Sequence, residues 1–520
     1  MMSRQYYPIG EQDFKSLREM ECVYVDKTRF IDVMLSSRNK YFFLARPRRF
    51  GKSLFLSTLQ YFFEGKRELF KNLYIDTTNW DWKPYPVLRL DLNRNKFADE
   101  EALDEVLDNL FRKWEKEYRV ETIADQLSSR FENIIEAAYK HTGCQVVILV
   151  DEYDKPLVGN VNNDIIFEHY RTKLAGIYSN FKSSAQYIRL VFLTGVSRFS
   201  KLSVFSDLNN LKDITFSDDF ADVCGITEKE LLENFQPGIQ RLASKRKVNF
   251  EDAYLSLKRN YDGYRFTPEG SDIYNPWSLL NAMSEARIGG YWNATGAATV
   301  IAEALKNAEV DLEKTLNARW SLDRLAGLDL RNADPTALLY QTGYLTIGNY
   351  DFENETVKLK VPNEEVKKGL FNDMLPIYTK GKRGVIEGVV ADIIDAIRYG
   401  EAEKIMRNLD TYFASIPYDL RIEHENNFQN ALYILLTLIG VDAKAEVHTS
   451  DGRIDLLIET PKYIYILELK YNASSDLALR QIEDKQYSRK FTSDSRKIFM
   501  IGVNFSSKTR RIQDWKIKTI

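Results

Sequence analysis

The triplet Gly51-Lys52-Ser53 has the residue types of a loop that binds phosphate. In such a loop, backbone N–H groups surround the phosphate, the lysine reaches the β- and γ-phosphates, and the serine hydroxyl binds Mg²⁺. Arg46 stands where the usual pattern has its first glycine, and this weakens the motif because that turn normally uses glycine's backbone freedom. At average composition, roughly one such chain in five contains this kind of triplet by chance. The triplet is therefore informative only together with the elements around it.

Two acids at the end of an apolar strand supply the second half of this site. The segment Gln145-Val-Val-Ile-Leu-Val-Asp151-Glu152 is a continuous apolar run that stops at its acids. One carboxylate would bind Mg²⁺, and the other would polarise the water that attacks a nucleoside triphosphate. A strand ending in solvated acids is common, so this segment alone would not indicate a site. Its position after the loop favours ATP binding.

A polar segment that follows another apolar run, Thr194-Gly-Val-Ser-Arg198, is the third candidate part of this site. Thr194 or Ser197 is placed to sense the γ-phosphate, and Arg198 either stabilises phosphoryl charge or is an ordinary structural arginine. We expect Arg46, Arg48 and Arg49 to add attraction for the anion, with plain surface charge as the alternative. The residues that we expect to bind the nucleotide are Arg48, Arg49, Phe50, Gly51, Lys52, Ser53, Leu54, Asp151, Thr194 and Arg198, with Ser53 and Asp151 as Mg²⁺ ligands and Glu152 as the catalytic carboxylate that polarises the attacking water.

The C-terminal part of the chain contains a second group of residues suited to chemistry. Asp455 lies on the predicted strand Gly452–Glu459, and Glu468 and Lys470 lie on the predicted strand Tyr463–Lys470. The turn Thr460-Pro461-Lys462 makes these strands a hairpin, which brings Asp455 near Glu468, and residues two apart on a strand share a face. Two carboxylates beside a lysine suit metal-assisted hydrolysis of a phosphodiester. Asp455 and Glu468 would hold Mg²⁺, Lys470 would orient the water, and Glu425 would complete the metal shell.

Around these residues, apolar runs alternate with helical patterns. The runs Tyr41–Ala45, Pro86–Asp91, Val146–Val150 and Ile188–Thr194 predict a parallel sheet covered by helices on both faces. Residues 226–330 have mostly helical patterns, 331–410 mix short strands with two helices, and a new pattern starts near 411. We therefore predict three domains: an ATPase at 1–225, a mostly helical lid and connecting region at 226–410, and a nuclease-like α/β domain at 411–520.

Composition limits the possible functions. The 520 residues have a net charge of -3, so no global basic field attracts nucleic acid or membranes, and contact with DNA must use a local patch. The scattered Cys22, Cys144 and Cys224 fit a reducing cytoplasm, and no segment resembles a secretion signal or a membrane span. Trp80 and Trp82 are expected to be packing anchors, because no basic run accompanies them.

In combination, several motifs resemble the bacterial AAA-ATPase-like family, whose members often carry a C-terminal PD-(D/E)xK nuclease-like domain. They are Tyr7-Pro-Ile-Gly10, Tyr24-Val-Asp-Lys-Thr28, the phosphate loop, Asp151-Glu-Tyr-Asp-Lys-Pro156, Thr194-Gly-Val-Ser-Arg-Phe-Ser200 and Tyr274-Asn-Pro-Trp-Ser278. The resemblance covers nearly the whole chain. It implies that arginine at position 46 is a family variant, and that Gln481 and Tyr487 contact the nucleic-acid backbone. The expected fold is α/β: an N-terminal P-loop NTPase parallel sheet, a mostly helical middle and a C-terminal PD-(D/E)xK nuclease-like domain.

The leading interpretation is a cytoplasmic ATPase that uses ATP and Mg²⁺ and is coupled to cleavage of nucleic acid, with DNA as the expected substrate and a homo-oligomer as an expected assembly. A first alternative is a nucleotide-dependent switch that cuts nothing and binds nucleic acid or a protein partner. A second is an ATPase whose nuclease-like domain serves only for packing. Intact Asp455, Glu468 and Lys470 favour the leading interpretation.

Overall fold

The computed structural model describes residues 5–93, 97–121, 124–161, 163–198, 211–292, 315–316, 318–327, 334–370, 383–414, 435, 442–449, 452–491, 494–506, 508–509 and 511–520, with 383–387, 442–449 and 452–454 described by their backbone only. The chain divides into two compact units. The first contains residues 1–297 and 317–366, and the second contains residues 298–316 and 367–520.

The first unit is built on a five-stranded sheet. Its strands are β1 (Tyr41–Ala45), β2 (Val87–Asp91), β3 (Val146–Asp151), β4 (Ile188–Gly195) and β5 (Lys212–Asp213). Their order is β2-β3-β4-β1-β5, and all neighbours are parallel. Because β1 and β3 are buried along their whole length, their sequences are continuous apolar runs. The predicted parallel sheet is confirmed, whereas β5 had no signal in the sequence.

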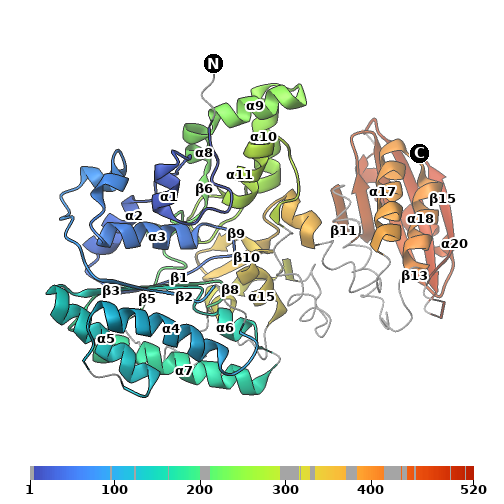
Figure 1. The fold of residues 1–520 in the computed structure, drawn as a ribbon. Helices are drawn as coiled ribbons and strands as arrows, with labels where there is room; N and C mark the ends of the chain where they lie inside the picture. The colour runs from blue at the N-terminus through green and yellow to red at the C-terminus, as the bar shows by residue number, and fades with distance from the viewer. Residues whose placement is uncertain are drawn as a thin grey trace. The chain divides into compact units, whose positions relative to one another are not determined.

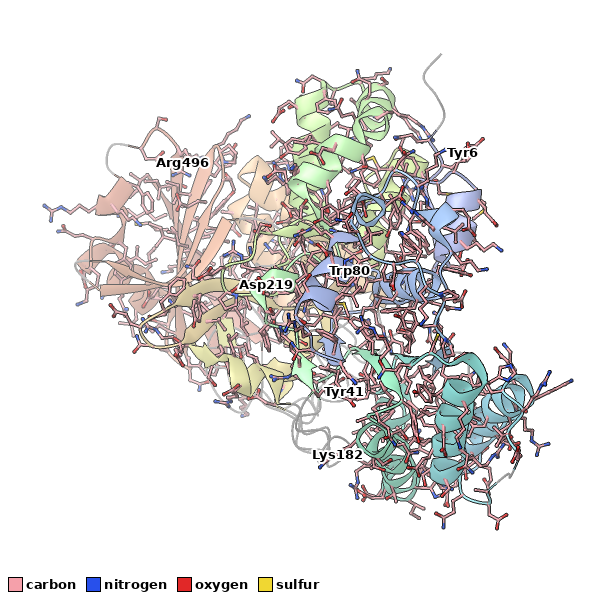
Figure 2. All side chains as sticks on the ribbon, turned by 90° about the vertical axis from the view of Figure 1, so that its left-hand side faces the viewer. Tyr6, Tyr41, Trp80, Lys182, Asp219 and Arg496 are labelled. Carbon is pink, nitrogen blue, oxygen red and sulfur yellow. The ribbon has the colours of Figure 1, made fainter. Side chains whose placement is uncertain are left out.

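Helices cover both faces of this sheet, as predicted (Figure 1). On one face lie α1 (Phe14–Glu19), α2 (Arg29–Ser36) and α3 (Lys52–Phe63). On the other lie α4 (Ala102–Glu117), α5 (Leu127–Thr142), α6 (Lys155–Val158) and α7 (Asp164–Ser183). Short 3-10 turns occupy Arg67–Phe70, Tyr74–Thr77 and Asp218–Phe220. Trp80 donates its indole N–H to Asp32 Oδ1 at 2.8 Å, and the Trp82 ring packs on Phe62 and Phe70, so both are packing anchors (Figure 2).

The first unit continues with helices and two small sheets. The helices α8 (Glu228–Asn234), α9 (Gln236–Arg246), α10 (Phe250–Tyr261) and α11 (Pro276–Glu285) share an apolar core. The strands β6 (Ile226–Thr227) and β7 (Ile273–Tyr274) pair antiparallel. A second small sheet has the order β8-β10-β9, with β8 (Trp320–Ser321), β9 (Thr346–Asp351) and β10 (Thr356–Lys360), and it accompanies α14 (Leu322–Ala326) and α15 (Pro335–Thr342).

The second unit contains a mixed sheet of order β11-β12-β13-β14-β15. Its strands are β11 (Asp442–Thr449), β12 (Gly452–Glu459), β13 (Tyr463–Tyr471), β14 (Lys497–Ser506) and β15 (Arg511–Thr519). Neighbours are antiparallel except β13 and β14, which are parallel and joined by α20 (Ser475–Asp484) and a 3-10 turn, Tyr487–Phe491. The predicted hairpin of β12 and β13 is confirmed.

Successive side chains of a strand point to opposite faces of the sheet, so each one packs against the helices on its own face. Ile482 of α20 packs with Leu457, Ile464 and Met500 on one face. Tyr465, from the opposite face, donates to the carbonyl of Ile397 at 2.8 Å. Ile397 belongs to α17 (Arg383–Tyr399), which packs with α18 (Ala402–Ala414). The face of β13 that carries Glu468 and Lys470 is therefore the face covered by α20.

Ion pairs fix the end of the β12–β13 hairpin. Arg496 donates to Glu459 Oε2 at 2.9 Å and to the carbonyl of Thr460 at 3.0 Å (Figure 2). Its guanidinium also holds the pKa of Asp494 down to about 2.

Among the helices that the structure describes, none has both the length and the apolar composition that a membrane span requires.

Candidate functional site

The phosphate loop lies between β1 and α3, and left-handed backbone gives it its shape. Arg49 and Gly51 have φ values of 67° and 97°. Glycine adopts the second value without the steric penalty of a Cβ atom, which accounts for Gly51 directly before α3. The helix then starts at Lys52, so the first backbone N–H groups of α3 face the end of the loop.

Lys52 is buried and folds back over its own loop. Its side chain is 3% exposed, and its Nζ donates to the carbonyls of Arg46 at 3.0 Å and Pro47 at 3.3 Å. The same Nζ lies 3.3 Å from Glu152 Oε1. The lysine of the loop and the second acid of β3 therefore meet in one site, although a hundred residues or so separate them along the chain.

Asp151 stands at the centre of a buried polar network. Thr194 Oγ1 donates to Asp151 Oδ1 at 2.9 Å, Arg89 lies 3.5 Å from Oδ2, and Ser53 also bonds to this carboxylate. Burial raises the pKa of Asp151, the nearby Glu152 adds to this effect, and the bonds from Ser53 and Thr194 oppose it. Because β4 lies between β1 and β3, Thr194 reaches Asp151 from the neighbouring strand. A buried carboxylate and a hydroxyl in contact form a donor set that Mg²⁺ favours.

A cavity of ≈ 440 Å³ opens at the phosphate loop; Lys52, Ser53 and Glu152 line it, whereas Asp151 and Thr194 lie behind its lining residues. This volume lies within the usual range for small-molecule sites, about 300–1,000 Å³. Four cationic side chains line it, and so do residues of the N-terminal segment and of α11. Among the residues that line it are Arg48, Arg49, Lys52, Lys155, Glu152 and Trp277. An anion with several charges, such as a nucleoside triphosphate, matches this lining.

An apolar cavity of ≈ 90 Å³ adjoins the first, since both are lined by Gly51, Leu54, Pro276 and Leu280. Phe50 lines only this apolar cavity, where it packs edge-on against Tyr264 and Phe266. At its rim, Lys27 pairs with Glu230 of α8 at 2.7 Å.

The second unit brings together three of the residues predicted from its hairpin. Glu468 is 1% exposed, and its Oε1 accepts hydrogen bonds from Lys470 at 3.2 Å and from Gln481 of α20. Asp455 Oδ2 accepts from the backbone N–H of Leu469 at 2.8 Å, which places this carboxylate beside Glu468. Glu468 Oε2 is buried and has no hydrogen-bond partner among the described groups. Burial raises the pKa of Glu468 to about 7, and the charge of Asp455 adds to this while Lys470 opposes it.

Comparison with known proteins decides the family. Residues 8–205 match the family model described as a predicted AAA-ATPase, and residues 423–515 match the PD-(D/E)XK nuclease superfamily. The "Uncharacterized protein in vnfD 5'region" of Azotobacter chroococcum mcd 1 is 31% identical over 530 residues, with both chains covered in full. The chain belongs to the AAA-ATPase-like family. It ends in a PD-(D/E)XK nuclease superfamily domain.

In this AAA-ATPase-like chain, Arg46 is a structural residue, and the expectation that it attracts the anion is wrong. Arg46 is 1% exposed and does not line the cavity. Nη1 donates to the carbonyls of Ala45 at 3.0 Å and Thr215 at 2.7 Å, and Nη2 donates to Phe220 at 3.2 Å. The guanidinium therefore ties the start of the loop to the segment that follows β5.

Arg198 also differs from its expected role as a phosphate ligand. Its side chain pairs with Asp213 of β5 and lies over the Phe216 ring, and it is absent from the lining of the phosphate cavity. The structural alternative is the one that the geometry supports. Thr194 does not line the phosphate cavity, and its hydroxyl bonds to Asp151.

Three outcomes concern the nuclease domain. Tyr487 is 2% exposed and packs in the core with Leu457, Ile482 and Phe491, so the expectation that it contacts a nucleic-acid backbone is wrong. Gln481 reaches the site, where it binds Glu468. Glu425 lies outside the described residues, among which no group of three His, Cys, Asp or Glu side chains is placed to hold a metal.

Sequence reasoning missed three residues of the phosphate site. Asp154 accepts hydrogen bonds from the N–H groups of Val196 and Ser197, and its signal was the third acid of the segment Asp151–Pro156. Trp277 lines the cavity, and the guanidinium of Arg49 lies 3.9 Å from the centre of its ring. Lys155 lines the cavity too and binds Asn93. Trp277 comes from α11, so the region after residue 225 forms one wall of the site.

Proposed function

We propose that this chain binds and hydrolyses ATP at the cavity around Lys52, and that hydrolysis gates Mg²⁺-dependent cleavage of DNA at Asp455, Glu468 and Lys470. The observation that carries the cleavage half is the buried carboxylate of Glu468, whose Oε2 has no hydrogen-bond partner among the described groups and lies beside a second carboxylate and a lysine. Such an atom is costly to bury unless a cation completes it.

At the ATP site, the residues of the chain have separable tasks. Arg48, Arg49 and Lys155 would attract the triphosphate, and Lys52 would exchange its loop carbonyls for phosphate oxygens. Ser53 and Asp151 would hold Mg²⁺, which when bound neutralises charge on the β- and γ-phosphates. Glu152 would orient the attacking water and accept its proton. The apolar cavity beside Leu54 would take the base.

At the nuclease site, the donor set fits a hard divalent cation. Asp455 and Glu468 would supply carboxylate oxygens, and burial and the charge of Asp455 raise the pKa of Glu468 although Lys470 opposes them. Mg²⁺ bound there would supply Lewis-acid stabilisation of the phosphodiester. Lys470, whose side chain is 31% exposed, would orient the attacking water or stabilise phosphoryl charge. Gln481 would keep Glu468 in place.

The test measures ATP hydrolysis and DNA cleavage in the same protein. Wild-type chain with Mg²⁺ is incubated with linear duplex, circular duplex and single-stranded DNA, with ATP and without it. Glu468→Gln should abolish cleavage and leave ATP hydrolysis intact, while Lys52→Ala should weaken nucleotide binding and remove ATP-dependent cleavage. Glu459→Gln is the matched control, because Glu459 lies on β12 and pairs with Arg496 away from the site.

The outcomes separate the interpretations. Wild-type protein that binds ATP but leaves every DNA form intact would support the alternative of a switch that binds nucleic acid or a partner. A Lys52→Ala protein with full nucleotide affinity would contradict both interpretations. Cleavage that survives Glu468→Gln would place the chemistry elsewhere.

A further inference from the structure

Three successive backbone N–H groups after β4 are held by two side chains. Val196 and Ser197 donate to Asp154 Oδ2 at 3.1 Å and 2.7 Å, and Arg198 donates to Gln341 Oε1 at 3.1 Å. The turn is packed as well as bonded, because a Cβ atom at Gly195 would lie 2.6 Å from the Tyr153 ring. The position of this turn, which begins two residues after Thr194, is therefore set by Asp154 on one side and Gln341 on the other.

Gln341 comes from α15, far along the chain. Its side chain is 7% exposed, and its Nε2 donates to the carbonyl of Leu325 at the end of α14 at 2.9 Å. One side-chain amide thus joins the turn after β4 to the two helices that accompany the β8-β10-β9 sheet. We call α14, α15 and these three strands, which lie within the described residues 320–327 and 334–360, the relay module.

The relay module also touches the phosphate loop. Gly343, directly after α15, has φ 90°, and a Cβ atom there would lie 2.9 Å from Pro47 Cβ. The carbonyl of Pro47 accepts a hydrogen bond from Lys52 Nζ. Tyr340 stacks on Phe216, the residue over which Arg198 lies. The end of α15 therefore contacts two segments of the nucleotide site: the segment after β4, which follows Thr194, and the phosphate loop, which holds Lys52.

A pair of helices beside a hairpin is also an arrangement that reads DNA, with one helix in the major groove. Here α15 is buried from Thr336 to Gln341, so it cannot enter a groove. The exposed turn of the β9–β10 hairpin carries Glu353 and Glu355, whose charge repels phosphate. These features argue against DNA reading through α15 or through the turn of this hairpin, and the contacts of the module with the nucleotide site are the ones that the inference uses.

We propose that Asp154 and Gln341 are positioning residues that clamp the turn after β4, and that through Gln341 the relay module sets the rate of ATP hydrolysis. The inference rests on the proposed ATPase function. A nucleotide that moves Thr194 or Lys52 must also move the turn or Pro47, and each of these is packed against α15. Movement of the module would alter the catalytic geometry by the same contacts, since coupling acts in both directions.

The experiment compares three variants of the full chain. Gln341→Ala removes both hydrogen bonds, and Gln341→Glu keeps an acceptor for the N–H of Arg198. Thr342→Val, the matched control, removes a side-chain bond of 2.6 Å to the carbonyl of Leu338 on the same helix, without touching the turn. Each variant is assayed for the kcat of ATP hydrolysis and for its Kd for Mg-ATP. Hydrogen–deuterium exchange at residues 338–343 is measured with Mg-ADP and without it.

We expect Gln341→Ala to lower kcat by about tenfold or more while the Kd changes by less than about threefold, because a small displacement of a catalytic group has this effect. Gln341→Glu should recover part of the loss, and Thr342→Val should match the wild type. Mg-ADP should slow exchange at residues 338–343 in the wild type but not in Gln341→Ala. Wild-type protein that binds Mg-ADP without any change in exchange there would overturn the relay and leave the ATPase proposal standing. Failure to bind nucleotide at all would end both.

Discussion

Replacing Arg46 by alanine separates a structural arginine from one that attracts phosphate. The buried guanidinium donates to three carbonyls, those of Ala45, Thr215 and Phe220. Each buried carbonyl left without its donor typically costs about 1–3 kcal/mol. Since water can enter the space left, we expect the lower end for each of the three, about 3 kcal/mol in total in the free energy of unfolding.

Calorimetry gives the first readout and titration with Mg-ATP the second. A loss of about 3 kcal/mol corresponds to a fall of about 5–10 °C in the Tm of a domain of this size. Arg46→Gly, which restores the usual glycine of the loop, should be no more stable than Arg46→Ala, because glycine supplies none of the three donors. Arg48→Ala is the matched control: this exposed side chain lines the cavity, so its loss should weaken Mg-ATP binding about fivefold and change stability by less than about 0.5 kcal/mol.

The reverse pattern would refute this reasoning. If Arg46→Ala unfolds at the wild-type temperature but binds Mg-ATP more weakly, and if salt weakens the difference, Arg46 acts on the anion through space. The structural account of the replaced glycine would then be wrong.

Three further predictions concern other buried groups. Burial raises the pKa of Asp262 to about 6, so the folded state keeps a proton that the unfolded chain releases, and the stability from this bound proton is lost as the pH rises from about 4 to 6. Asp262→Asn should therefore raise the free energy of unfolding by about 2 kcal/mol at pH 8 and by little near pH 4. An equal gain at both pH values would contradict the assignment. Glu230→Gln keeps an acceptor at the start of α8 but leaves the charge of Lys27 buried without its ion-pair partner. Urea unfolding should therefore show a loss of about 2–3 kcal/mol in the free energy of unfolding. The additional change Lys27→Met should largely restore this free energy, because it removes the unpaired charge. Tyr487→Phe should leave the affinity for duplex DNA within about twofold in a filter-binding assay, because the buried ring cannot reach a phosphate; a larger loss would restore the predicted contact.

Patterns local in the chain predicted most of the fold. Four continuous apolar runs gave four strands of the parallel sheet, and the turn at residues 460–462 gave the β12–β13 hairpin with Asp455 beside Glu468. These features are fixed by short-range alternation and by acids at strand ends, which a sequence displays directly. The strand β5 has two residues, too few to show a period.

The contacts that local patterns did not predict join residues far apart in the sequence. Arg46 finds its partners 169 and 174 residues away, and Gln341 finds the N–H of Arg198 at a separation of 143. No local pattern records such pairings, because any arginine or glutamine is compatible with exposure, a ligand or a buried carbonyl. Tyr487 was misplaced for a related reason: a tyrosine after a helix can point outward, and only the packing of Ile482 and Phe491 places it inside.

The arginines at 46, 48 and 49 show how backbone geometry assigns roles that residue type leaves open. Arg46 follows directly after β1, so its side chain keeps the direction of a buried strand and meets carbonyls. Arg49 has a left-handed backbone, with φ 67°, and its guanidinium stacks on Trp277, while Arg48 lines the cavity. One of the three arginines thus holds the loop to the segment after β5, and the other two lie at the cavity. Arginine is tolerated in place of the first glycine because the positive φ values of this loop lie at residues 49 and 51 and not at residue 46.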